Sequence, residues 1–276
     1  MSMCLFSASS ILARFISGLG LLGGLLVCCS AHATDNGIAR LLQAYPDQLC
    51  GARGNTLVWC DGTTMPYDDG KGAKTHQQKL QNADLQEQME QHYPHGANYP
   101  SPPPPDFEPG RIRNDAFFKK MYGNSAAEVH KHLTSITWLP STSGQRIQVT
   151  TINRVHEHLQ AVSNELDQLP GALKRFVDQP AGAFNWRVIA AEKRLSPHSF
   201  GIAFDINAAT GDYWLWRASA GHEPSLYRNR IPMEIVSIFE KHGFIWGGKW
   251  YHYDTLHFEY RPELLIEGKE SVSGVR

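Results

Sequence analysis

The sequence predicts a fold of the α+β class. Some stretches alternate apolar and polar residues, as half-buried strands do, and others place apolar residues every three or four positions, as amphipathic helices do. These two kinds of stretch follow one another without the regular βαβ rhythm of a parallel sheet covered by helices. Strands and helices mixed in this irregular order are typical of α+β proteins.

Residues 1–33 are predicted to be a secretory signal peptide. The segment Phe15–Cys29 is apolar and uncharged, Arg14 precedes it, and Ala31-His-Ala33 provides a small-residue cleavage site. The apolar run is shorter than the ~20 residues that usually span a bilayer, so cleavage is favoured over a retained N-terminal anchor, which stays the alternative. We therefore expect secretion across the inner membrane to the periplasm or the extracellular space, with no stable membrane span after signal removal.

The other cysteines and the charge balance suit an exported chain. Only Cys50 and Cys60 lie beyond the signal, and they are ten residues apart. In an exported protein this pair favours one disulfide closing a small loop over a half-site for a metal. The formal net charge of −1 argues neither for nucleic acid nor for an anionic membrane surface as a partner, and no nucleic-acid partner is expected. The sequence does not indicate an oligomeric state.

Residues 34–110 are expected to form an N-terminal extension that is mostly irregular and helical. A short helix is predicted at residues 38–46, a strand at residues 57–59 and a polar helix at residues 79–91. A stiff polyproline stretch at residues 99–106 then marks a boundary or forms a strap across the surface.

Residues 111–268 are expected to form the main domain, and residues 269–276 a frayed tail. The two periodicities described above predict strands and amphipathic helices within this domain. The strands are expected at residues 147–152 and 184–189, and the helices at residues 152–177, interrupted at Pro170, and at residues 233–242.

Two histidines and one aspartate of this domain have the composition of a catalytic metal site. His198 precedes Asp205 by seven residues, and His257 lies near the C-terminal end of the domain. Two imidazoles and a carboxylate that leave a fourth position for water suit catalytic zinc, whereas structural sites are usually closed by four Cys or His ligands. A turn at Gly201 followed by a half-buried strand would return Asp205 towards His198. Other divalent metals accept the same donors, so these residues alone do not fix the metal as zinc.

A candidate general base lies three residues before the last of these ligands. Asp254 stands where a strand containing His257 should begin, and its carboxylate could accept a proton from a water molecule beside the metal. On that strand Glu259 would share a face with His257, and Phe258 would point to the opposite side.

These motifs resemble the family of zinc D-Ala-D-Ala carboxypeptidases and L-alanyl-D-glutamate endopeptidases, which includes vancomycin-resistance-type D,D-peptidases and many phage endolysins. The family pattern is Ser-x-His-x6-Asp, followed by an acidic residue, two further residues and His-Phe. The matching residues are Ser196, His198, Asp205, Asp254 and His257-Phe258. The detailed resemblance covers residues 182–262.

Two further segments are similar to the same family. Gly182-Ala-Phe-Asn-Trp-Arg187 looks like the family's Gly-x-aromatic-x-x-Arg segment, and the resemblance implies that Arg187 holds the oxyanion or orients the substrate. Trp246-Gly-Gly-Lys-Trp250 is similar to a run of the endopeptidase branch. Ser196 and Trp246 are predicted to contact substrate.

The resemblance also implies a fold, a cofactor and a reaction. The fold would be the hedgehog-like small antiparallel sheet flanked by helices, with one Zn²⁺ held on the sheet. The reaction would be hydrolysis of peptidoglycan stem peptides with Asp254 as the base. Removal of the terminal D-Ala and cleavage within the stem remain open, and the aspartate at position 254 favours the second only slightly.

Two alternatives to this enzyme are considered. One is a non-catalytic zinc-containing cell-wall-binding module of the same fold, which would have no need of a base, so Asp254 and Arg187 favour an enzyme. The other is a serine peptidase that uses Ser196 or Ser199 with His198. It is disfavoured because no nucleophile-elbow pattern surrounds these residues.

Overall fold

The computed structural model describes residues 37–189, 192–219 and 226–266. The predicted signal peptide and the predicted C-terminal tail lie outside these ranges. Within them, no helix is both long enough and apolar enough to cross a membrane.

A four-stranded antiparallel sheet is the centre of the fold. Its strand order is β6 (Pro180–Gly182), β7 (Ala203–Asn207), β9 (His257–Tyr260), β8 (Phe244–Trp246). In the two central strands Asp205 lies opposite His257, and Phe204 lies opposite Phe258. The predicted half-buried strand after Gly201 is therefore confirmed as β7.

One face of this sheet is apolar and the other polar, because successive side chains of a strand point to opposite sides. Phe204 and Phe258 point to the core, where Phe239 of α9 (Met233–Lys241) stacks on Phe258 with ring centroids 3.7 Å apart. Asp205 and His257 alternate with these phenylalanines and point to the opposite face, where the candidate site lies. Packing of the apolar face against the core thus holds in place the two strands whose polar face carries Asp205 and His257.

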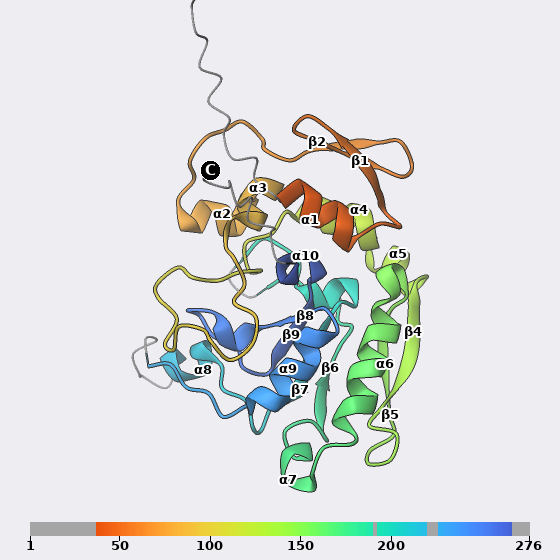
Figure 1. The fold of residues 1–276 in the computed structure, drawn as a ribbon, viewed down its shortest axis with the longest axis vertical. Coiled ribbons are helices and arrows are strands. Elements are labelled where there is room, and N and C mark those ends of the chain that lie inside the picture. The colour runs from red at the N-terminus through yellow and green to blue at the C-terminus, as the bar shows by residue number, and fades with distance from the viewer. Residues whose placement is uncertain (1–36, 190–191, 220–225, 267–276) are drawn as a thin grey trace, which may run out of the picture. The chain divides into compact units, whose positions relative to one another are not determined.

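A two-stranded hairpin extends the core away from the central sheet. Its strands β4 (Leu133–Trp138) and β5 (Gln145–Thr150) are antiparallel, and α6 (Val155–Leu166) packs along them (Figure 1). Trp138 links the hairpin to the central sheet, since its ring centroid lies 4.3 Å from that of Phe204.

Two predictions for this region need adjustment. The predicted helix at residues 152–177 forms as a 3-10 turn, η1 (Ile152–Arg154), followed by α6 and by α7 (Gly171–Lys174), so the break at Pro170 is confirmed. The strand predicted at residues 184–189 is wrong for most of its length, since only Val188 pairs, in one bridge with Leu195. The backbone here bonds instead to the loop that carries His198: the Asn185 N–H donates to the carbonyl of His198.

The N-terminal elements share the hydrophobic core of the central sheet. That core runs from Leu41 to Leu264, and the hydroxyl of Tyr45 donates to Glu263 at 2.6 Å. The elements are α1 (Gly37–Ala44), β1 (Leu49–Arg53), β2 (Thr56–Trp59), β3 (Thr64–Pro66), α2 (His76–Asn82), α3 (Leu85–Glu90), α4 (Asp115–Tyr122) and α5 (Ala126–His130), and the chain ends its described part with α10 (Pro262–Leu265). The predicted disulfide between Cys50 and Cys60 is present. A domain boundary near residue 110 stays a prediction.

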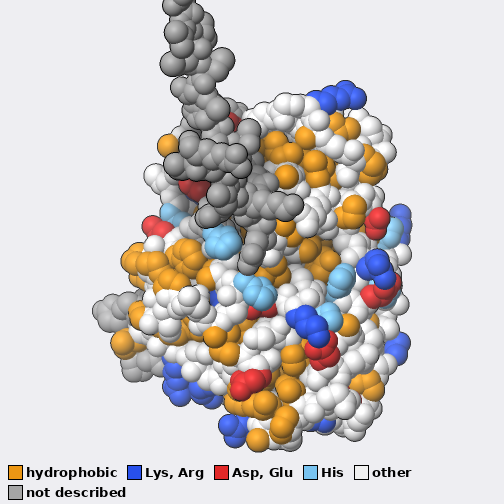
Figure 2. All heavy atoms as spheres, viewed as in Figure 1, with side chains coloured by type: hydrophobic (Ala, Val, Ile, Leu, Met, Phe, Trp, Pro, Cys, Tyr) orange, Lys and Arg blue, Asp and Glu red, His pale blue; other side chains and the backbone are white. Residues whose placement is uncertain are grey.

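Charges of both signs are mixed over the visible surface. On the face shown in Figure 2, Lys and Arg side chains are interspersed with Asp and Glu side chains and with hydrophobic groups. This face therefore offers no large area of a single sign for an oppositely charged polymer.

Candidate metal and catalytic site

The loop that carries His198 is shaped by its own sequence. Ser196 caps the short 3-10 helix η2 (Pro197–Phe200), its hydroxyl accepting a hydrogen bond from the His198 N–H, and Pro197 occupies the first helical position. Gly201 ends the helix in the left-handed conformation, with φ of 67°. This turn sends the chain directly into β7, so that Asp205 returns to His198 as predicted.

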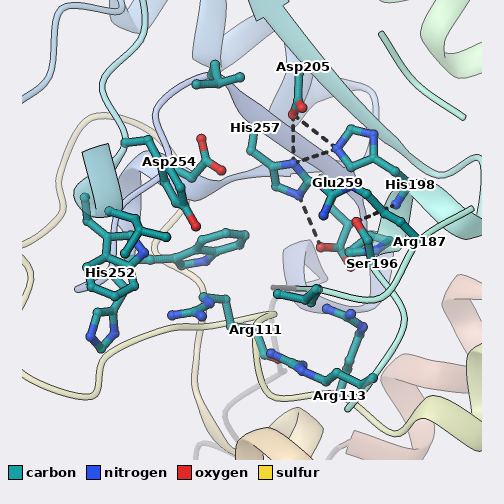
Figure 3. A pocket seen from close by; sticks show the side chains of 18 of the residues that line it. Arg111, Arg113, Arg187, Ser196, His198, Asp205, His252, Asp254, His257 and Glu259 are labelled. Atoms are coloured by element: carbon teal, nitrogen blue, oxygen red, sulfur yellow. Dashed lines mark hydrogen bonds and ion pairs between the residues drawn. The ribbon is translucent and has the colours of Figure 1, made fainter. Parts of the chain in front are cut away.

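Three donor atoms converge above the sheet (Figure 3). Asp205 Oδ1 lies 3.2 Å from His198 Nε2 and 2.9 Å from His257 Nδ1, and the two ring nitrogens are 3.2 Å apart. Ligands at zinc distances in tetrahedral geometry would be ~3.3 Å from one another. The three side chains therefore fit a zinc ion with only a small outward adjustment, and they leave a fourth position open to the pocket.

Each histidine is oriented by a second contact of its ring. His198 Nδ1 lies 2.5 Å from the carbonyl of Ala183, so it carries the proton and leaves Nε2 free to donate its lone pair. His257 Nε2 faces the carboxylate of Glu259 at 3.6 Å, and Glu259 is held in turn by Arg261. Contacts of this kind fix the tautomer and direction of metal-binding histidines.

The electrostatic environment of the three ligands favours positive charge. Burial alone would lower the pKa of His257, but hydrogen bonds to Asp205 and Glu259 outweigh it and raise that pKa to about 10. Burial would raise the pKa of Asp205, yet the nearby His198 and His257 hold it well below its usual range. A site that holds a proton so firmly in the absence of metal is one in which a divalent cation is also stabilised.

Asp254 lies beside this cluster but outside it. Its carboxyl group is half-buried in the pocket wall, and its Oδ1 atom has no hydrogen-bond partner within the described part of the chain. Burial raises the pKa of Asp254 to about 6. Its backbone is fixed, since its N–H donates to Gly247 of η3 (Gly247–Lys249) and its carbonyl accepts from the N–H of His257. A carboxylate with a free oxygen and a pKa near neutrality has the properties of a general base.

A pocket of about 340 Å³ opens in front of the three ligands. Aromatic side chains line part of it, from Trp250 and from the start of α8 (Trp214–Ser219). Arginine side chains line another part, including Arg111 and Arg113. The pocket therefore joins the carboxylate-rich candidate metal site to a basic wall.

The predicted site residues Arg187 and Ser196 both line this pocket. The backbone of Arg187 is anchored by Ser199, whose hydroxyl accepts from the Arg187 N–H and donates to the Arg187 carbonyl, each at 2.9 Å. Its side chain is exposed to the pocket. Ser196 is 2% exposed and Ser199 fully buried, and both hydroxyls make local backbone contacts, so neither of these two serines is poised as a nucleophile beside His198.

Trp246 does not lie where the substrate-contact prediction puts it. Its side chain is fully buried in the core and its indole N–H donates to the carbonyl of Thr255 at 2.8 Å. Trp246 pairs with Phe258 across β8 and β9 and so points to the apolar face of the sheet. Trp250, from the same sequence run, lines the pocket instead, with its ring centroid 5.7 Å from that of His257.

Sequence reasoning missed the arginines at positions 111 and 113. They follow the polyproline stretch, more than 80 residues before His198, and enter the pocket through the packing of that segment on the η3 loop: the Trp250 indole donates to Pro109 and the Tyr251 N–H donates to Phe107. The only local signal was an Arg-Ile-Arg triplet directly after Gly110.

A second cluster of acidic side chains is explained without a metal ion. Asp68, Asp69 and Asp84 offer oxygens close to one another, but the ammonium group of Lys74 lies 3.1 Å from Asp69 and 3.7 Å from Asp84. Lys74 thus pairs with two of the three carboxylates, and the Gly70 N–H donates to Asp68 at 2.7 Å, in agreement with the interpretation of Asp68-Asp69-Gly70 as a turn.

Comparison with protein-family models identifies residues 190–260, about a quarter of the chain, with the family described as D-alanyl-D-alanine carboxypeptidase. Comparisons with curated proteins and with solved structures gave no match. The matched segment contains the three candidate metal ligands and Asp254. The resemblance seen in the sequence is thus confirmed for this segment, which carries the pattern of the D-alanyl-D-alanine carboxypeptidase family of peptidases.

Proposed function

We propose that this protein is an exported zinc peptidase that hydrolyses peptidoglycan stem peptides, as a D-alanyl-D-alanine carboxypeptidase or an L-alanyl-D-glutamate endopeptidase. The observation that carries the proposal is Asp254, a carboxylate with one unpartnered oxygen next to a His-Asp-His cluster. A binding module would have no use for such a group, whose burial without a partner costs stability. The family match supports a peptidase, and the disulfide is compatible with export.

His198, Asp205 and His257 would hold the metal. When bound there, zinc supplies Lewis acidity towards the scissile carbonyl and makes water a stronger acid. The pocket in front of these residues would place the scissile peptide bond between the metal side and the basic wall.

The protein's own groups handle the protons and the developing charge. Asp254 takes a proton from the attacking water as the water oxygen bonds to the carbonyl carbon. It then delivers that proton to the leaving nitrogen as the C–N bond breaks, which yields a carboxylate and an amine. Arg187 donates hydrogen bonds to the oxyanion or to a substrate carboxylate. Ser196 serves by capping η2 and thereby placing His198.

The test is a mass-spectrometric digest of purified muropeptides. Zinc-loaded protein lacking residues 1–33 is compared with Asp254→Ala at equal metal occupancy. Loss of one terminal alanine from pentapeptide stems identifies a D,D-carboxypeptidase, and peptides that begin at D-glutamate identify the endopeptidase. Either activity should be absent from the variant. If zinc-loaded wild-type protein leaves every stem intact, the peptidase proposal fails and the binding module takes its place.

A further inference from the structure

The basic wall of the pocket consists of four arginines: Arg111, Arg113, Arg187 and Arg194. Figure 3 shows two of them, Arg111 and Arg113, across the pocket from Asp205. These two come from the segment before α4, outside residues 190–260, so the family pattern does not account for them.

Two of the four arginines are neutralised within the protein. Arg111 donates to Glu108 at 2.6 Å and lies 3.2 Å from Glu192. Arg194 is paired with the same Glu192 and also donates to the carbonyl of Arg111. These ion pairs build the wall and leave little charge for a ligand.

Arg113 has no such partner. Its side chain is 4% exposed, and one of its terminal N–H groups donates to the carbonyl of Leu195. Its Nε–H group is buried without a hydrogen-bond partner, and no carboxylate among the described residues lies within ion-pair distance of it. An unpaired guanidinium in a buried wall is unfavourable unless a ligand supplies the missing acceptor.

The two carboxylates whose charge acts on Arg113, Glu259 and Asp115, both have other cationic partners, although Oδ1 of Asp115 is buried without a hydrogen-bond partner. Glu259 is held by Arg261 at 3.2 Å and faces His257. Asp115 pairs with Lys119 at 3.4 Å. Burial lowers the pKa of Arg113 to about 9, so the guanidinium keeps its charge at neutral pH and presents it to the pocket.

We propose that Arg113 binds a free carboxylate of the substrate and thereby makes the pocket selective for acidic peptides. The inference deepens the proposed function and rests on it, because stem peptides contain D-glutamate and so carry a carboxylate besides the C-terminal one. A planar guanidinium with its Nε–H free is suited to hold a carboxylate through two parallel hydrogen bonds. Arg187, exposed at the same pocket, remains available for the oxyanion or for another carboxylate.

The experiment is a binding cycle on zinc-loaded Asp254→Asn protein, which should hold the peptide without cutting it. The probes are a pentapeptide stem and a series of analogues in which each carboxylate in turn is a carboxamide. Calorimetry gives the Kd of every probe with Arg113 intact, with Arg113→Gln and with Arg113→Lys. Arg146→Gln, which removes an exposed arginine of the β4–β5 hairpin, is the matched control.

With Arg113 intact, one carboxamide analogue should bind about 10-fold or more weakly than the parent, the size expected for a charge-assisted hydrogen bond. The Arg113→Gln protein should bind the parent peptide about as weakly as the intact protein binds that analogue. It should also bind the parent and the analogue with equal Kd. The difference in Kd between the parent and the analogue should be partly kept in Arg113→Lys and fully kept in Arg146→Gln. A carboxylate held by Arg187 would instead keep its full effect in the Arg113→Gln protein.

Two results overturn the inference. One is a loss of affinity in Arg113→Gln that is the same for the parent and for every analogue. The other is an unchanged affinity with a lower unfolding midpoint, which would assign Arg113 to a structural contact with Asp115. If Arg113→Gln does not fold, Arg113→Lys takes its place: a carboxamide effect that is undiminished in Arg113→Lys, or equal affinities of the intact protein for the parent and every analogue, overturns the inference. Binding that depends on one carboxylate, in a wild-type protein that cuts no stem, would instead refute the proposed function alone.

Discussion

Replacing Asp254 by asparagine should make the metal-free protein more stable while it makes the enzyme slower. Asparagine has nearly the same size and removes only the charge. The carboxyl of Asp254 is half-buried with an unpartnered Oδ1 atom, so its ionised form is poorly solvated in the folded state. The side chain that serves as the base therefore weakens the fold that holds it.

The magnitude follows from the pKa of Asp254. Burial raises that pKa from 3.8 to about 6, and each unit corresponds to ~1.4 kcal/mol. Below pH 3.8 the group is protonated in both folded and unfolded chains, so it carries no penalty. Between pH 3.8 and about 6 the carboxyl is ionised in the unfolded chain but still mostly protonated in the folded one, so the penalty grows with pH and levels off at ~3 kcal/mol above pH 6. The Asp254→Asn variant would carry no such penalty at any pH, because a carboxamide does not ionise.

The assay is urea denaturation of the metal-free wild type and of Asp254→Asn at pH 7 and pH 4. The variant should be more stable by ~3 kcal/mol at pH 7 and by only ~0.5 kcal/mol at pH 4. Asp47→Asn, at an exposed position, should change stability by less than ~0.5 kcal/mol at either pH. With zinc bound, kcat of Asp254→Asn should fall by about 10²- to 10⁴-fold. A variant that is less stable than wild type at pH 7, or a gain that does not change with pH, would refute the reasoning.

Four further outcomes are expected. Glu259→Gln should weaken zinc binding about 10- to 100-fold in a chelator competition assay, because Glu259 orients the ring of His257. His198→Ala should lose stoichiometric zinc in equilibrium dialysis, because one of three protein ligands is gone. The rate at saturating zinc should rise with pH along an acid limb at or below pH 6, because Asp254 must be ionised to take a proton and the cation lowers its pKa from about 6. Cys60→Ser should lower the free energy of unfolding by ~3 kcal/mol in urea titrations, the chain-entropy value for a loop closed by a disulfide between residues ten apart.

Controls separate these effects from general damage. Glu165→Gln removes a carboxylate that pairs with Lys241 and His242 on the surface, and it should leave zinc affinity unchanged. Wild-type zinc affinity in Glu259→Gln would contradict the orienting role of that carboxylate, and full zinc occupancy in His198→Ala would contradict the assigned ligand set. A rate that is flat down to pH 4 would exclude Asp254 as the base. A reductant should destabilise the wild type but not Cys60→Ser, and equal effects on both would speak against the disulfide.

The sequence by itself determined the composition of the site and the local geometry of two of its parts. The spacing from His198 through Gly201 to Asp205 is a local feature, because a turn at Gly201 and a strand of fixed period follow from neighbouring residues. The same period put His257 and Glu259 on one face and Phe258 on the other. The break at Pro170 and the disulfide were likewise set by the properties of single residue types.

Only the tertiary structure decided which distant residues complete the pocket. Trp246 and Trp250 belong to one sequence run, and the pairing of β8 with β9 buries the first and leaves the second at the site. The segment at residues 184–189 alternates like a strand, yet its backbone follows the His198 loop. Arg113 reaches the pocket from a segment whose place is fixed by contacts far along the chain, such as that of Trp250 with Pro109. Local patterns carry no information about such contacts, because they depend on how separate elements pack and not on the period of any one of them.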